Sequence, residues 1–221
     1  MIVEIWSDVA CPWCYVGKRR LEAALADFEH RDEVELRWRS FELDPGVPRE
    51  RDVDGATHLA EKYGLSRDEA VARQRQLAEL AAGDGLEMRF DLVRGANTFD
   101  AHRLLHLAAE RGVQNELKER LMRAHHTEGE SLGDPATLER LAVDAGLDRE
   151  EVRDVLGGDR YRSAVRADEQ MAASLGINGV PFFVADRRVA ASGAQSPEVL
   201  GAMLRQAWDA SAALAGGAAA G

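Results

Sequence analysis

The order of hydrophobic and polar positions predicts a strand, a helix and a second strand at the start of the chain. Residues 2–6 form a short apolar run of strand character. Leu21, Leu25 and Phe28 then recur at helical spacing and form one apolar face. Residues 34–41 alternate between apolar and charged side chains, which is typical of a half-buried strand. The chain therefore opens with a strand–helix–strand unit.

The next hundred residues carry helical patterns and no convincing strand. Ser66 and Glu69 have the spacing of a capping box, and Asp134 and Asp148 stand where further helices would begin. Apolar residues in this part return at intervals of three and four, as on an amphipathic helix. We therefore expect residues 51–158 to form an all-helical block.

Strand signals return only near the C-terminal end. Residues 181–185 are apolar, residues 186–188 have turn character, and residues 189–191 continue the strand pattern, so a β-hairpin is predicted. A last amphipathic helix follows the hairpin. The final residues, 216–221, are only glycine and alanine, and we expect a flexible tail there.

Composition narrows the classes of partner. The 221 residues carry a formal net charge of −11. Such a surface repels phosphate backbones and anionic lipids, so neither a nucleic acid nor a membrane is an expected partner. No apolar run approaches the ~18 residues of a membrane span, and no basic leader precedes the first strand, so we expect a cytoplasmic protein. The pattern does not indicate an oligomeric state.

Cys11 and Cys14 are the only two cysteines, and they lie at the predicted start of the first helix. Unpaired backbone N–H groups and the positive end of the helix dipole stabilise a thiolate there, so Cys11 is the predicted nucleophile. Cys14, one turn further on, is placed to resolve a mixed disulfide. Pro12 suits the first helical position, and Trp13 completes the Cys-Pro-Trp-Cys motif.

Two other interpretations of this motif remain open: two inert buried cysteines, or half of a zinc site. A structural zinc site needs four ligands, and the chain has no second pair of cysteines. We therefore favour a redox-active dithiol that needs no other cofactor, and we expect no metal site.

Three segments, in chain order, resemble the DsbA-family thiol–disulfide oxidoreductases of the FrnE-like branch. They are 7–19 (SDVACPWCYVGKR), 97–103 (NTFDAHR) and 179–184 (GVPFFV), and 192–197 (SGAQSP) also fits. The related 2-hydroxychromene-2-carboxylate isomerases and kappa-class glutathione transferases share features of these segments. They typically carry a serine at the position of Cys11 and use glutathione.

The resemblance implies an α/β fold that agrees with the pattern of elements. It is a thioredoxin-like fold with an inserted all-helical domain. The thioredoxin-like domain would comprise residues 1–50 and 159–215, and the helical insertion residues 51–158. The location of the insertion suggests a lid over the dithiol, although an insertion that only stabilises the fold is the alternative.

The resemblance also implies active-site roles outside the cysteine motif. In thioredoxin folds the proline corresponding to Pro181 is cis and faces the dithiol. The backbone groups of Val180 could then pair with a substrate peptide as an added strand. Asn97 and Thr98 match positions that line the cleft and contact a thiol substrate, although both residue types also suit a plain helix cap.

Several charged residues keep two interpretations. Asp8 is either a proton acceptor for the second thiol or an ordinary loop acid, and Lys18 either adds positive potential or is a solvated surface charge. His102 and His106 share a helix face but lack the acidic neighbour of a zinc-protease motif, so we expect ordinary helix residues. The alternative for His102 is that it reaches the cleft.

The leading functional hypothesis is an enzyme, a cytoplasmic dithiol–disulfide oxidoreductase that reduces or isomerises disulfides of protein or small-molecule substrates. Glutathione is a possible co-substrate. The alternative enzyme is a glutathione-dependent isomerase or transferase acting on a small aromatic compound. A third hypothesis is a binding module that holds a partner or a soft metal through Cys11 and Cys14 without turnover.

Overall fold

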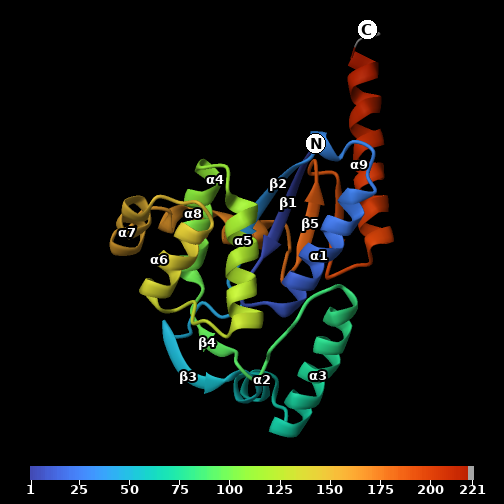
Figure 1. The fold of residues 1–221 in the computed structure, drawn as a ribbon. Coiled ribbons are helices and arrows are strands. Elements are labelled where there is room, and N and C mark those ends of the chain that lie inside the picture. The colour runs from blue at the N-terminus through green and yellow to red at the C-terminus, as the bar shows by residue number, and fades with distance from the viewer. Residues whose placement is uncertain (219–221) are drawn as a thin grey trace.

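The structure, a computed structural model, describes residues 1–218, and their side chains except those of residues 50–52 and 212–218. A four-stranded mixed sheet lies at its centre (Figure 1). Its strands are β1 (Ile2–Ser7), β2 (Glu35–Ser40), β5 (Phe182–Ala185) and β6 (Val189–Ser192). Their order is β2-β1-β5-β6, with β1 and β2 parallel and the other pairs antiparallel. The predicted opening unit and the C-terminal hairpin are both present.

Helices cover both faces of this sheet. Side chains along β1 alternate in direction, and apolar ones point to each face. Val3 and Ile5 enter a core shared with α1 (Pro12–Ala26) and α9 (Pro197–Ala218), which pack against each other. Trp6 points to the opposite face, where α8 (Arg162–Ser174) covers it. The dithiol therefore lies at the end of a strand that is buried on both sides.

The segment between β2 and α8 carries six α-helices, and the last four of them share a hydrophobic core (Figure 1). Its helices are α2 (Gly55–Tyr63), α3 (Arg67–Gly83), α4 (Phe99–Glu110), α5 (Gln114–Arg123), α6 (Pro135–Asp144) and α7 (Arg149–Gly157). A π-helical turn, Ala124–Glu128, extends α5. The predicted class, a thioredoxin-like fold with a helical insertion, is confirmed.

Two short strands inside the insertion were not expected. β3 (Glu50–Asp54) pairs antiparallel with β4 (Arg94–Ala96) in a ribbon separate from the main sheet. Neither strand alternates between apolar and polar residues, and backbone pairing alone leaves no such pattern in a sequence. The insertion is therefore mostly helical rather than all-helical.

The predicted helix starts agree with the structure. Ser66 and Glu69 form a reciprocal capping box at the start of α3, and the Asp134 and Asp148 carboxylates cap α6 and α7. The last helix, α9, continues to Ala218, in line with the high helix propensity of alanine, and a flexible tail over 216–221 stays a prediction. Residues 219–221 lie outside the described residues. Within the described part, no helix is long and apolar enough to cross a membrane.

Candidate active site

The cysteine motif lies where the chain passes from β1 into α1. Cys11 is the residue just before the helix and has an extended backbone (φ −87°, ψ 113°). Its carbonyl accepts hydrogen bonds from the amides of Cys14 (3.0 Å) and Tyr15 (3.3 Å). Pro12 is the first helical residue and loses nothing there, because the first amides of a helix have no intrahelical acceptor.

The two cysteines are both buried and differ slightly in exposure. Both cysteines are free thiols. Cys11 keeps 4% of its surface exposed and Cys14 none. The Cys11 sulfur lies 3.8 Å from the carbonyl oxygen of Val180. Cys11 is therefore the more exposed residue of the pair.

The loop before β5 brings Val180 and Pro181 against the dithiol, and the Val180–Pro181 peptide is cis. Gly17 on α1 makes this approach possible. A Cβ atom at Gly17 would lie 2.8 Å from the Pro181 ring and 3.3 Å from Phe183. The glycine is thus a packing requirement of the site, since a methyl group cannot fit without displacing the proline.

An apolar wall surrounds the sulfurs. Both cysteines belong to a buried cluster that also contains methionine, leucine and aromatic side chains from α1, α3 and the segment after α3. Trp13, between the cysteines, is 44% exposed. The wall desolvates the thiols, and Trp13 offers an open aromatic surface beside them.

Asp8 is buried three residues before Cys11, so it is not an ordinary loop acid. Its carboxylate accepts hydrogen bonds from the amides of Leu43 (2.8 Å) and Ala10 (3.3 Å). Burial by itself would raise the pKa of Asp8. The contact with His102 and the Leu43 bond outweigh burial and lower the pKa to about 2. Asp8 therefore carries a fixed negative charge beneath the dithiol.

Lys118 on α5 supplies a buried cation that nothing in the sequence pattern singled out. Its ammonium donates to the Ser7 carbonyl (3.2 Å) and lies 5.3 Å from the centre of the Trp38 ring. Burial lowers the pKa of Lys118 to about 8, although the negative charges of Cys14 and Asp8 oppose this. The dithiol thus has an anion and a cation close by in the protein interior.

The electrostatics correct one expectation about Cys11. The helix start was expected to lower the pKa of its thiol, and the structure indicates a raised pKa instead. The hydrogen bond with the Cys14 sulfur is the main cause, followed by burial, and the charge of Asp8 adds to both. The backbone contribution of the helix start acts in the expected direction but is outweighed.

Two buried histidines contact the loop that precedes Cys11. His102 Nε2 lies 3.4 Å from Asp8 Oδ1, so this residue reaches the active-site region. His126, in the π-helical turn, places its Nε2 3.1 Å from the Val9 carbonyl and stacks on Tyr15. Such π-helical turns recur at functional sites. In a sequence, this turn looks like ordinary helix, so His126 gave no signal.

Asn97 and Thr98 directly precede α4, the helix that carries His102. The Asn97 side chain accepts from the Phe99 amide (2.9 Å) and donates to the Val47 carbonyl (3.1 Å). Asn97 thus caps the helix and fixes the loop after β2, while Thr98 is buried and makes no capping bond. A contact of either residue with substrate stays a prediction.

Other charged candidates have structural partners. Lys18 is buried and pairs with Glu22 and Glu119, so it is not a solvated surface charge. His106 lies 3.3 Å from Asp168, away from Asp8. Among the described residues, no group of three or more His, Cys, Asp or Glu side chains could hold a metal ion.

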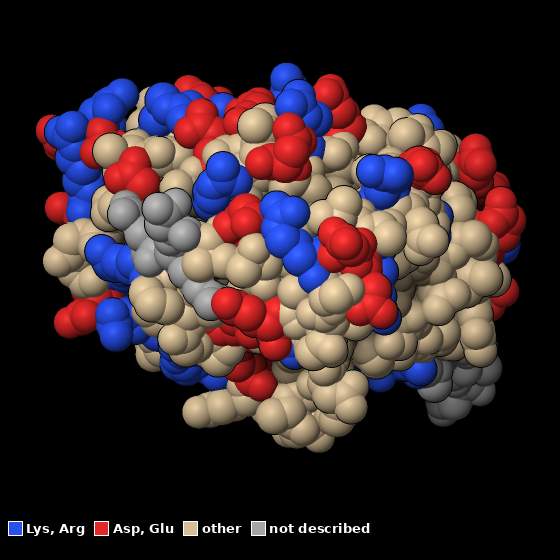
Figure 2. All heavy atoms as spheres, turned by 90° about the horizontal axis from the view of Figure 1, so that it is seen from below, with Lys and Arg blue, Asp and Glu red and all other residues tan. Residues whose placement is uncertain are grey.

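The surface near the insertion has mixed charge. Figure 2 shows, from below, the end of the molecule that carries β3, α2 and α3 in Figure 1. Acidic and basic side chains are interspersed there with uncharged ones. This face therefore carries no large area of a single charge.

Comparison with known proteins agrees with this geometry. A probable DsbA oxidoreductase from Streptomyces coelicolor has 51% sequence identity, a TM-score of 0.90, and coverage of 95% of this chain and 90% of its own. Two more distant structures share only the fold. The cytosolic disulfide reductase DsbM from Pseudomonas aeruginosa, solved with GSH, has 19% identity, a TM-score of 0.65, and coverage of 93% of this chain and 98% of its own. A 2-hydroxychromene-2-carboxylate isomerase has 16% identity, a TM-score of 0.65, and coverage of 97% and 99%.

The family assignment rests on more than one structure. Residues 2–205 match the DSBA-like thioredoxin domain, a span that includes the cysteine motif, the whole insertion and the Val180–Pro181 loop. Sheet order, the dithiol at a helix start and the cis proline opposite it all lie within this match. This protein therefore belongs to the family of DsbA-like thioredoxin-fold proteins.

Proposed function

We propose that this protein is a cytoplasmic dithiol–disulfide oxidoreductase that reduces or isomerises disulfides with Cys11 and Cys14. The observation that carries the proposal is the pair of free sulfurs at the start of α1, with the Cys11 sulfur 3.8 Å from the Val180 carbonyl. A substrate strand that pairs with the backbone of Val180 would bring its own sulfur to Cys11.

The reaction proceeds through two exchanges. The Cys11 thiolate attacks one sulfur of the substrate disulfide, a Cys11–substrate disulfide forms, and the other substrate sulfur leaves as a thiolate. The Cys14 thiolate then attacks the Cys11 sulfur and releases the second substrate thiolate. The substrate gains two electrons and the Cys11–Cys14 pair is left as a disulfide. Two thiols, such as two molecules of glutathione, then restore the dithiol and are themselves joined as a disulfide.

Asp8 and Lys118 have different roles in this scheme. With a pKa of about 2, Asp8 is too weak a base to take a proton from a thiol. Its charge instead attracts the ammonium of Lys118, whose pKa of about 8 is close to that of a free thiol. Lys118 is therefore the group that would compensate the negative charge as Cys14 becomes a thiolate.

The raised pKa of the Cys11 thiol supports reduction rather than net oxidation. A strong oxidant stabilises its reduced form as a thiolate, and here the Cys14 contact, burial and Asp8 oppose the thiolate. We therefore expect a reduction potential of roughly −270 to −120 mV, at the reducing end of that range. The shared fold with DsbM, a cytosolic disulfide reductase solved with GSH, supports glutathione as the electron source.

The test combines insulin reduction with trapping of a mixed disulfide. The reduced wild type should cleave insulin disulfides in the presence of dithiothreitol, and Cys11→Ser should not. Cys14→Ser should form a mixed disulfide that persists until a reductant is added, because the resolving thiol is gone. Absence of both insulin cleavage and trapped complex would refute the oxidoreductase assignment.

The alternative enzyme, a glutathione-dependent isomerase or transferase, would not need Cys14 for its reaction. Activation of a glutathione thiol needs one residue at the position of Cys11 and no resolving sulfur. Turnover of a small aromatic substrate by Cys14→Ser, with no insulin reduction by the wild type, would favour this alternative. Metal retained through mild purification would favour the thiol-based binding module.

A further inference from the structure

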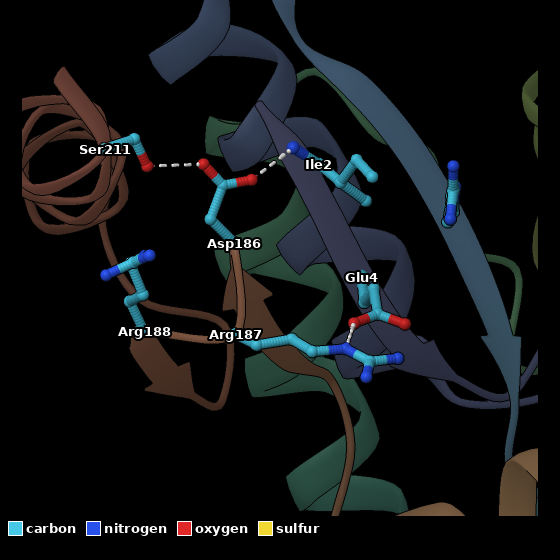
Figure 3. Close-up of a pocket in the computed structure, with 7 residues that line it drawn as sticks. Ile2, Glu4, Asp186, Arg187, Arg188 and Ser211 are labelled. Atoms are coloured by element: carbon cyan, nitrogen blue, oxygen red, sulfur yellow. Dashed lines mark hydrogen bonds and ion pairs between the residues drawn. The ribbon is translucent and has the colours of Figure 1, made fainter. Parts of the chain in front are cut away.

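A second candidate site lies at the opposite end of the sheet from the dithiol. A pocket with a volume of about 340 Å³ opens where β1 begins, between the β5–β6 turn, β2 and α9 (Figure 3). β1 runs six residues from this pocket toward the dithiol, a distance on the order of 20 Å. A ligand bound here would not cover the sulfurs.

The turn that borders the pocket has an unfavourable backbone. Asp186 and Arg187 both have positive φ, 46° and 55°, and the amide of Arg188 donates to the Ala185 carbonyl (3.0 Å). Hairpin turns of this kind favour Asn-Gly, because a side chain such as that of arginine is disfavoured at positive φ. Such conformations persist only where the surroundings impose them, and they recur at ligand-binding positions.

Asp186 imposes this conformation. One carboxylate oxygen accepts from the Ile2 amide (2.7 Å), and the other accepts from the Ser211 hydroxyl (2.8 Å) on α9. Figure 3 shows Asp186 held between these two partners while Arg187 crosses the pocket toward Glu4. The turn is therefore fixed at two points, and its two arginines are presented at the pocket.

The arginines around the pocket have unused donors. Arg37 and Arg187 each use the Nε atom, to Glu35 (2.6 Å) and to Glu4 (3.1 Å). Arg188 makes no hydrogen bond or ion pair with any described side chain, and only its charge acts on Asp186. The terminal nitrogens of all three guanidinium groups thus remain available to a ligand within the described structure.

Carboxylates near the pocket are already compensated. Glu4 accepts from Arg39 with one oxygen and from Arg187 with the other, and these two cations lower its pKa although burial opposes them. The Met1 ammonium and Arg188 also act on Asp186. Arg188 is therefore a cation that has only a longer-range charge interaction with Asp186 among the described groups, on a protein whose formal net charge is −11.

We propose that this pocket binds a tetrahedral oxyanion, either free phosphate or the phosphoryl group of a small molecule. Guanidinium groups present parallel N–H donors that match phosphate oxygens, and three such groups border one pocket. Neither the fold assignment nor the dithiol chemistry requires this site, and the proposal does not depend on the proposed function.

The test is calorimetric titration of the reduced protein with inorganic phosphate and, separately, with ADP at low ionic strength. One site is expected, with affinity that falls as chloride is added. Arg188→Gln should weaken binding about tenfold, because a charge-assisted hydrogen bond contributes about 1.5 kcal/mol. Tighter binding of ADP would identify a phosphorylated molecule as the ligand, and equal affinity would identify free phosphate.

Two further variants separate a site from a diffuse charge effect. Arg73→Gln removes the same charge from an exposed position on α3 and should leave the affinity unchanged. Arg187→Gly relieves the positive φ, so it should lose phosphate affinity without lowering the melting temperature. The proposal would be overturned if phosphate gave no binding heat, or if Arg73→Gln weakened binding as much as Arg188→Gln. Full phosphate affinity in Arg187→Gly would also overturn it. So would slower alkylation of Cys11 by iodoacetamide when phosphate is present, because the ligand would then lie near the sulfurs.

Discussion

At the scale of single residues, the pKa of the Cys11 thiol is set by burial and by groups close to it in the chain. The Cys14 sulfur, burial and the Asp8 carboxylate all disfavour the Cys11 thiolate. Only a thiolate attacks a disulfide, so these groups would set the rate of the first step of the proposed exchange. Their separate contributions can be measured by alkylation.

Removal of Cys14 should make Cys11 more reactive at neutral pH. Cys14→Ala eliminates the largest cause of the raised Cys11 pKa, and Asp8→Asn eliminates a smaller one. Iodoacetamide labelling of Cys11 between pH 6 and 10 should therefore shift to lower pH in both variants, and further in Cys14→Ala. A shift to higher pH in either variant would contradict this assignment of causes.

The buried charge of Lys118 should lower the free energy of unfolding at neutral pH, and this loss should disappear at high pH, where the amine is neutral. Its pKa falls from the ordinary 10.5 of a lysine to about 8 on folding, so the unfolded chain binds more protons between these values. Stability attributable to this group therefore rises with pH through that window. Lys118→Met should raise the free energy of unfolding at pH 7 by up to about 3 kcal/mol, and the gain should vanish above pH 10.5.

Denaturant titrations of the wild type and of Lys118→Met at several pH values measure this difference in the free energy of unfolding. Lys62→Met is the matched control, because Lys62 is exposed and pairs with Asp44 at the surface. It should change stability little at any pH. A gain for Lys118→Met that is independent of pH would exclude titration of the buried amine as its cause.

At the scale of elements, the contact between α1 and the Val180–Pro181 loop fixes the geometry of the site. Gly17 is the point of closest approach, and a Cβ atom there would overlap Pro181. A glycine inside a helix ordinarily costs stability relative to alanine. Its presence in α1 is therefore explained by the packing of the proline.

Gly17→Ala should lower insulin-reduction activity and stability together. The new methyl group must displace Pro181, and overpacking of this kind costs about 1–3 kcal/mol. Gly201→Ala in α9 is the control, since its Cβ would meet only the flexible end of Arg205, and helix propensity should make it neutral or stabilising. Activity assays and thermal unfolding of both variants decide between these outcomes.

Sequence patterns predicted the elements with strong local signals and missed those held by distant contacts. The Cys-Pro-Trp-Cys motif, the helix caps at Ser66 and Asp134, and the hairpin near the C-terminus each carry their signal within a few residues. Lys118 and His126 look like ordinary polar helix residues until tertiary packing buries them. Burial of a polar side chain depends on segments far away in the chain, so a local pattern cannot predict it.

At the scale of the whole molecule, Val9 joins the two parts of the fold. It lies in the active-site loop of the thioredoxin-like part, yet its side chain is fully buried in the core of the helical insertion. Its carbonyl also meets His126 of the insertion. The two parts therefore share a boundary that passes directly beneath the dithiol.

This shared boundary predicts one cooperative unfolding transition. All four tryptophans lie in the thioredoxin-like part, whereas the insertion contributes six of the helices described above. Tryptophan fluorescence and far-ultraviolet circular dichroism should therefore give coincident denaturant curves. Val9→Ala should move both curves equally, by about 2 kcal/mol. Two separate transitions would show that the insertion folds as an independent unit.

The burial of basic side chains has a practical consequence for amine chemistry. Lys18, Lys62 and Lys118 are the only lysines of the chain, and two of them are buried. Acylating reagents and amine-directed cross-linkers should therefore react mainly with Lys62 and the N-terminal amine in the native protein. Partner capture by such cross-linkers would therefore sample only the parts of the surface near these two amines. Conversely, acylation of Lys118, read by peptide mass, would count the molecules whose interior has opened.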